Sequence, residues 1–281
     1  MSNLSGAPPA AIPFVRRDAR RGLFWLRRAH AMFRAAPLPW LVLLLVYYVL
    51  VALAELGPWP SVGKLAASIL KPVFAVGFLA AAWTQERGGR PRLRELFQGF
   101  RSNLWALVPL GIVFFGGMML AVWSTSLVDG GALIAWFSGS AEPSEELQRS
   151  GRIQLAFLFG ALCALPTILA LWFAPALVVF HDASAWTALS TSLRAALVNW
   201  RPTGVFGIAV LFYGGILPAL GATLARIVGE TAGTIVALGV VFPYMLVFLA
   251  TFQIADYVAY RDVFHADEPP ALGESPDPQA G

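Results

Sequence analysis

Lys71 lies within a long apolar stretch of this sequence and is its most promising ionisable residue. It sits about seven residues inside that stretch, or roughly 10 Å along a helix, and directly precedes Pro72. A charged side chain within a membrane-spanning helix is costly and often functional. Lys71 could therefore belong to a polar pathway. In the favoured alternative, its flexible stem carries the ammonium to the membrane surface, where it pairs with Glu55.

Asp256 is the second candidate for a polar pathway. At helical spacing it shares a face with Gln253 and Tyr260, near the end of the last apolar segment. In the favoured alternative, its carboxylate pairs with an interfacial arginine, either Arg201 or Arg261. The polar groups available for a pathway are therefore few.

Side chains that commonly carry catalysis or bind metals are isolated in this sequence. His30, His181 and His265 have no carboxylate or second histidine at ligand spacing. The single Cys163 and the scattered serines have no adjacent base for nucleophilic chemistry. No glycine-rich phosphate-binding motif is present. We therefore expect no catalytic, cofactor-binding or metal-binding residues, and a protein that is not an enzyme.

The composition is that of an integral membrane protein. Hydrophobic residues make up 58% of the 281 residues and charged residues 13%, whereas soluble domains carry about 25% charged residues. Long apolar segments predict an all-α domain over 16–261 with six spans. The predicted spans are 38–56, 62–83, 105–123, 153–180, 203–225 and 234–258. The polar, proline-bearing ends, 1–15 and 262–281, are predicted to be disordered.

The stretch 92–105 combines an apolar stripe, which includes Leu96 and Phe100, with a polar face that bears arginines. A helix of this kind lies in the plane of the membrane interface. Similar amphipathic stretches, 16–34 and 184–200, precede the first and fifth spans. The arginines that we expect at the lipid interface are Arg20, Arg21, Arg27, Arg34, Arg92, Arg94, Arg101 and Arg194.

The three amphipathic stretches can be aligned on their arginines at positions 34, 101 and 194. An apolar residue precedes each of these arginines, and a tryptophan follows at the start of each outgoing span. Each returning span carries a proline, at Pro72, Pro175 and Pro243. We therefore predict a threefold parallel repeat, in which each unit is an amphipathic helix followed by an outgoing and a returning span.

Basic residues are distributed unequally between the two faces of this topology. Fifteen of the 20 lysines and arginines lie on the face that carries both termini and the three amphipathic stretches. Basic loops stay in the cytoplasm, where anionic lipids attract them. We therefore predict cytoplasmic termini and anionic head groups as partners. The basic residues flank the spans, so the pI near 9.6 does not indicate nucleic-acid binding.

Several short stretches between residues 15 and 260 carry a recognisable combination of residues. They are 20–26, 33–34, 37–40, 71–74 with Gly77, 87–91 and 96–100. In these stretches the chain resembles a group of uncharacterised proteobacterial inner-membrane proteins. More loosely, it is similar to the six-helix membrane domain attached to some bacterial glycerophosphodiester phosphodiesterases. The resemblance implies a six-span inner-membrane protein. It implies no activity, because the group has none assigned and the phosphodiesterase catalytic domain is absent from this sequence.

Two functions fit these observations. The first is a non-enzymatic protein of the bacterial inner membrane, which binds lipid or a membrane-protein partner at its cytoplasmic interface. The alternative is a transporter or channel for a small solute or lipid, with the proline-bearing returning spans as its moving parts. A transporter needs several polar groups around one cavity near the midplane, and this sequence offers Lys71 and few others. The non-enzymatic binding protein is therefore the favoured hypothesis.

Overall fold

The computed structural model describes residues 12–142 and 144–265. Within this part of the chain all regular secondary structure is helical, so the predicted all-α class is confirmed. Six helical segments are long and apolar enough to cross a membrane, in agreement with the six predicted spans. They are Pro37–Leu56, Ser61–Glu86, Leu104–Asp129, Arg152–His181, Trp200–Ile227 and Glu230–Phe264.

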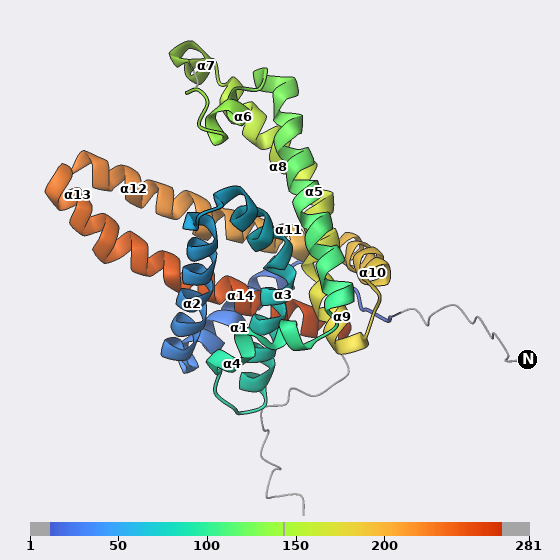
Figure 1. The fold of residues 1–281 in the computed structure, drawn as a ribbon. Helices are drawn as coiled ribbons and strands as arrows, with labels where there is room; N and C mark the ends of the chain where they lie inside the picture. Colours follow the sequence, from blue (N-terminus) through green and yellow to red (C-terminus); the bar gives the residue numbers. More distant parts are fainter. Residues whose placement is uncertain (1–11, 143, 266–281) are drawn as a thin grey trace, which may run out of the picture.

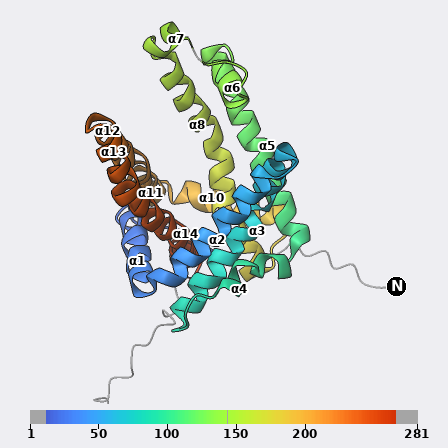
Figure 2. The same ribbon diagram turned by 60° about the vertical axis from the view of Figure 1, so that its left-hand side comes forward.

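These segments form three helical hairpins that diverge from a common base (Figures 1 and 2). The first hairpin consists of α2 (Pro37–Leu56) and α3 (Pro60–Glu86). The second consists of α5 (Leu104–Asp129), α8 (Arg152–Trp172) and α9 (Ala174–His181), with α6 (Ala132–Phe137) and α7 (Glu145–Arg149) at its far end. The third consists of α11 (Trp200–Leu211), η2 (Phe212–Ile216), α12 (Leu217–Ile227), α13 (Glu230–Val236), η3 (Ala237–Val241) and α14 (Phe242–Phe264).

Short helices at the base lead into the three hairpins, and we call them the connecting helices. They are α1 (Arg21–Ala35), α4 (Leu93–Leu96) with η1 (Gln98–Arg101), and α10 (Ala185–Val198). The pair α4 and η1 packs mainly on α3, and α10 packs mainly on α8 and α9. Helix α1 packs mainly on α14 and α11 of the third hairpin. Each connecting helix therefore packs chiefly on a hairpin other than the one that it leads into.

Two glycines let connecting helices approach their neighbours closely. A Cβ atom at Gly99 would lie 2.0 Å from the carbonyl oxygen of Val73 in α3. A Cβ atom at Gly22 would lie 2.3 Å from the carbonyl oxygen of Pro202 in α11. Any larger residue at these positions would force the helices apart, because both obstacles are backbone atoms.

The core lies at the base, and α1 contributes one whole side to it. Trp25, Ala29 and Phe33 are buried at helical spacing. The Trp25 ring packs edge-on against Trp172 and Phe206, with centroids 5.8 and 5.9 Å away. The apolar stripe of α1, whose amphipathic pattern predicts contact with the membrane interface, therefore contacts protein.

The other two amphipathic stretches divide their apolar residues between protein and surface. Leu96 of α4 and Leu189 of α10 are buried. Phe100 of η1 and Trp186 of α10 are exposed. Only part of each stripe therefore lies at the protein surface, because the neighbouring hairpin covers the rest.

Helix α5 extends beyond the boundary predicted at 123. The hydroxyls of Ser124, Thr125 and Ser126 donate to carbonyl oxygens three residues back in the helix. These bonds satisfy polar side chains locally, so the helix continues to Asp129. It ends at Gly130, whose φ of 68° is the left-handed conformation common after a helix.

Both predicted boundaries between the membrane domain and the tails also differ from the structure. Helix α14 continues to Phe264 instead of ending at the predicted boundary, and residues 12–15 lie against its end. The backbone N–H of Val15 donates to the carbonyl oxygen of Val263 at 2.9 Å. The rings of Phe14 and Phe264 lie 6.0 Å apart. These contacts order positions assigned to the tails by composition, and the rest of both predicted tails lies outside the described residues.

The second hairpin bends at Phe173, where α8 ends and α9 begins. Pro175 has no N–H and cannot bond to the preceding turn. Ser192 of α10 bonds to two backbone groups at this bend. Its hydroxyl accepts from the Phe173 N–H at 3.0 Å and donates to the Leu169 carbonyl at 2.8 Å. In the first hairpin, by contrast, α3 continues through Pro72 as one helix.

Candidate functional site

Asp262, in the last turn of α14, is the centre of the most extensive side-chain network at the base. Its carboxylate accepts bonds from Arg21 through two guanidinium nitrogens, and from the Trp25 indole at 2.8 Å. Arg17 lies 3.3 Å from the same carboxylate and donates to the Asp262 carbonyl at 2.8 Å. Only 5% of the Asp262 side chain is exposed. The buried charge is thus fully paired, as burial requires.

Arg17 also ties this network to the third hairpin. Its backbone N–H donates to the Asn199 side chain at 2.7 Å, and the Asn199 amide donates to the Val15 carbonyl at 3.1 Å. Asn199 is the residue between α10 and α11 and is buried. The segment before α1 is therefore fixed between the start of α11 and the end of α14.

Glu86, at the end of α3, forms a second network on the other side of α14. Its carboxylate accepts from the Tyr257 hydroxyl and pairs with the Arg261 guanidinium at 3.1 Å. One residue earlier, Gln85 accepts from the Trp40 indole and donates to the Met32 carbonyl, both at 2.7 Å. These bonds join α1, α2, α3 and α14 at the base.

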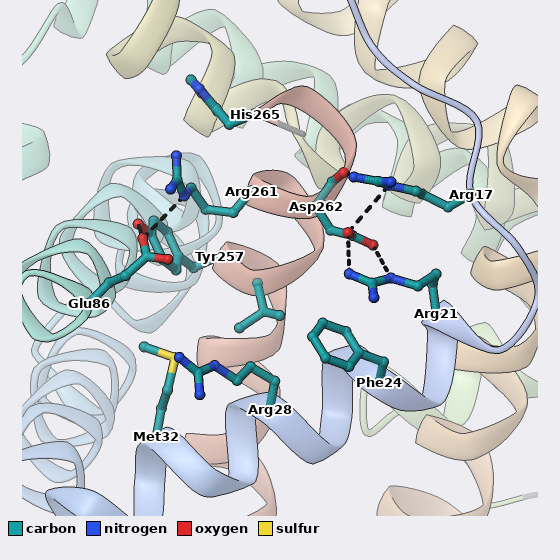
Figure 3. A pocket seen from close by; sticks show the side chains of 11 residues that line it. Arg17, Arg21, Phe24, Arg28, Met32, Glu86, Tyr257, Arg261, Asp262 and His265 are labelled. Atoms are coloured by element: carbon teal, nitrogen blue, oxygen red, sulfur yellow. Dashed lines mark hydrogen bonds and ion pairs between the residues drawn. The ribbon is translucent and has the colours of Figure 1, made fainter. Parts of the chain in front are cut away.

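A pocket of about 240 Å³ lies between these two networks, and we call it the basic pocket. Its walls are parts of α1, the end of α3 and the end of α14 (Figure 3). The lining residues are Arg17, Arg21, Phe24, Arg28, Met32, Glu86, Tyr257, Val258, Arg261, Asp262 and His265. Four arginines face two carboxylates there, so the lining carries excess positive charge.

A second hollow, of about 580 Å³, continues this surface around the start of α1. It is lined by Arg16, Arg17, Asp18, Ala19, Arg20 and Arg201. Arg17 belongs to both hollows. We call the combined surface the basic face.

The structure places the arginines predicted at the lipid interface in two kinds of environment. Seven of them have exposed side chains on or beside the connecting helices: Arg20, Arg27, Arg34, Arg92, Arg94, Arg101 and Arg194. Arg21 differs, because it is partly buried and bonded to Asp262. It acts in the fold of the base and also lines the basic pocket.

The three residues of the predicted polar pathway do not form one ion-paired group. Asp256 accepts a bond from the Trp172 indole at 2.9 Å. The Lys71 ammonium lies 4.5 Å from the centroid of the Phe114 ring. Among the described residues, the ion pairs do not include Lys71 with Glu55.

Sequence reasoning missed the two acids at the centre of the networks. Asp262 was assigned to the acidic tail, and Glu86 lies at the boundary of a polar connector. Helical spacing offered one signal, because Tyr257 and Arg261 are four residues apart and continue the period of the last span. In the described chain, no three histidine, cysteine or acidic residues are grouped so that they could hold a metal ion.

Comparison with known proteins identifies a relative of this chain. A probable inner membrane protein of Burkholderia thailandensis is 30% identical over 260 residues, which cover 90% of this chain and 94% of that protein. No family model matches the chain, and no solved structure matches it. With its six apolar helices, the chain is a multi-pass membrane protein, and it belongs to the same family as this probable inner membrane protein.

Proposed function

We propose that this protein is a non-enzymatic inner-membrane protein that binds anionic phospholipid at its cytoplasmic side. The observation that carries the proposal is the basic face, where arginines gather at the common base of the hairpins. Anionic lipids of the cytoplasmic leaflet attract such surfaces. The looser similarity to the membrane domain of phosphodiesterases stays a prediction and adds no activity to this proposal.

The base of the molecule also supports a threefold parallel repeat. α4 with η1 packs on the first hairpin, α10 packs on the second, and α1 packs on the third. The second and third connecting helices thus pack on the hairpin of the preceding unit, and α1, in the first unit, packs on the hairpin of the last unit. In this arrangement, the exposed arginines of all three connecting helices lie around one end of the protein.

The unequal distribution of lysines and arginines between the two faces supports a cytoplasmic position for the base of the hairpins and for both termini. Reporter fusions after residues 60, 90, 140, 190 and 228 test the orientation. Fusions after 90 and 190 should report the cytoplasm, and the other three should report the periplasm. A cytoplasmic reporter after residue 140 would overturn the topology.

Reconstitution in nanodiscs tests the lipid preference. The protein is placed in discs of phosphatidylcholine with increasing fractions of phosphatidylglycerol, and its thermal unfolding is followed. A ligand that binds only the folded protein raises Tm, so Tm should rise with the anionic fraction. Substitution of Arg16, Arg20 and Arg201 by glutamine should reduce the rise. A Tm of the wild-type protein that is independent of the anionic fraction would contradict the proposal.

A transporter or channel is the second candidate, and it is favoured by the Lys71 and Asp256 side chains within the spans. Ionisable groups at such depth often serve ion or proton pathways. Proteoliposomes that contain a pH-sensitive dye would reveal a proton leak. In this mechanism, Lys71→Met and Asp256→Asn abolish a leak seen in the wild-type protein. If proteoliposomes with the wild-type protein leak protons no faster than liposomes without protein, this would count against a proton pathway.

A further inference from the structure

The side of α1 that faces the basic pocket is distinct from the side that enters the core. Arg21, Phe24, Arg28 and Met32 line the pocket and are spaced three, four and four residues apart. At this spacing they form one stripe along the helix. The core stripe, which begins with Trp25, lies beside it. The sequence of α1 therefore positions a second stripe of side chains along the pocket, and of these Met32 also belongs to the buried core.

Arg28 differs from the other arginines of the pocket in its partners. Arg17 and Arg21 are paired with Asp262, and Arg261 is paired with Glu86. The side chain of Arg28 has no ion pair or hydrogen bond with any residue of 12–142 and 144–265. Figure 3 shows it extending beside Met32, on the side of Glu86 and Tyr257. Its guanidinium is thus available to an anion.

Both carboxylates of the pocket are already used within the protein. The Asp262 carboxylate pairs with Arg17 and accepts from Arg21 and Trp25, and the Glu86 carboxylate accepts from Tyr257 and pairs with Arg261. Neither acid forms an ion pair with Arg28. A bound anion would therefore meet a positive potential from four guanidinium groups, which two carboxylates offset only in part.

The size, lining and position of the pocket define the ligand further. A volume of about 240 Å³ is below the range of roughly 300–1,000 Å³ typical of sites that enclose a whole drug-sized ligand. Phe24, Met32 and Val258 add apolar walls beside the charges. The pocket lies at the ends of α3 and α14, two helices of apolar spans, and head groups are expected at the ends of spans. A phosphate group attached to an apolar body fits all three properties.

We infer that the basic pocket binds the phosphate of an anionic ligand, and that Arg28 is the residue that contacts it directly. This inference rests on the proposed function, since it assigns the site within the basic face. Guanidinium groups bind phosphate through two parallel charge-assisted hydrogen bonds. A phospholipid head group and free phosphate share this chemistry, and the experiment below distinguishes them.

The test uses the full chain, purified in a non-ionic detergent. Wild-type protein is titrated with dioctanoyl phosphatidylglycerol, with dioctanoyl phosphatidylcholine and with inorganic phosphate, and ligand affinity is taken from the rise in Tm. Arg28→Gln is compared with Arg226→Gln, since Arg226 is an exposed arginine of α12 that lines neither hollow. Arg28→Lys retains the positive charge but lacks the planar guanidinium group, which donates two parallel hydrogen bonds. Size-exclusion profiles and helical circular dichroism establish that the variants are folded.

Loss of a charge-assisted contact should weaken phosphatidylglycerol binding about tenfold or more in Arg28→Gln, with a smaller loss in Arg28→Lys. Arg226→Gln should bind within about twofold of wild type. Phosphate that binds much more weakly than phosphatidylglycerol identifies a lipid ligand, and phosphate of equal affinity identifies a free anion.

Two results would overturn the inference, and they separate it from the proposed function. If wild type prefers phosphatidylglycerol to phosphatidylcholine but Arg28→Gln and Arg226→Gln bind alike, the pocket assignment fails and lipid binding by the basic face stands. If wild type shows no preference for the anionic lipid, the proposed function fails, and the pocket assignment fails with it.

Discussion

Replacement of Asp262 should destabilise the protein more than replacement of any exposed acid. This carboxylate joins the end of α14 to the start of α1 through Arg17, Arg21 and Trp25. Asp262→Asn keeps the shape and one acceptor oxygen, but it removes the charge that two guanidinium groups face. Asp262→Ala also leaves the Trp25 indole N–H without its acceptor.

The exposed fractions of the partners set the size of the effect. Breaking a buried ion pair costs about 3–5 kcal/mol. Arg17 and Arg21 are 27% and 36% exposed, so water can solvate them once they are unpaired, and about half of that cost remains. We therefore expect about 2 kcal/mol for Asp262→Asn. A buried N–H without an acceptor, here that of the Trp25 indole, adds about 1–3 kcal/mol. Asp262→Ala should therefore cost about 4 kcal/mol.

Thermal unfolding in detergent is the assay, with unfolding rates recorded as well, because membrane proteins can unfold irreversibly. Tm should fall in the order wild type, Asp262→Asn, Asp262→Ala. Glu146→Gln, at an exposed site in α7, is the matched control and should unfold like wild type. Arg21→Gln in the Asp262→Asn background should cost less than in wild type, because its partner is already lost. Equal Tm values for all variants would refute a stabilising role of the network.

Three further substitutions test the packing of the base. Gln85→Leu should cost about 1–3 kcal/mol, because it leaves the buried indole N–H of Trp40 without an acceptor; a wild-type Tm would contradict this. Gly99→Val should speed proteolysis around η1, since no space exists for a Cβ there, whereas Gly116→Ala, with nothing within 4 Å, should be cleaved like wild type; equal cleavage of both variants would count against the close contact. Ser192→Ala should lower Tm, because it removes both bonds that satisfy the bend between α8 and α9; an unchanged Tm would show that the bend needs no such support.

Hydropathy predicted the six spans because each apolar segment is long enough on its own to cross a bilayer. Their ends were harder to predict. α5 continues through Ser124, Thr125 and Ser126 because the backbone of the same helix accepts their hydroxyls. Such local bonds make polar residues compatible with a helix, and a hydropathy profile does not register them.

The site was less accessible to sequence reasoning than the spans. Arg21 was predicted at the lipid interface from its place on an amphipathic helix, but its partner Asp262 is 241 residues away in the sequence. No periodic pattern links positions so far apart. Similarly, the pairing of Glu86 with Arg261 depends on how α3 and α14 meet at the base. The arginines of α1 were found by composition, and their separate roles emerged only from the fold.

Native mass spectrometry of the detergent-purified protein tests anionic-lipid binding by the basic face most directly. Wild type should retain phosphatidylglycerol in preference to phosphatidylethanolamine. A variant with Arg16, Arg20 and Arg28 replaced by glutamine should lose that preference while remaining folded. Equal retention of both lipids by the wild-type protein would contradict the account.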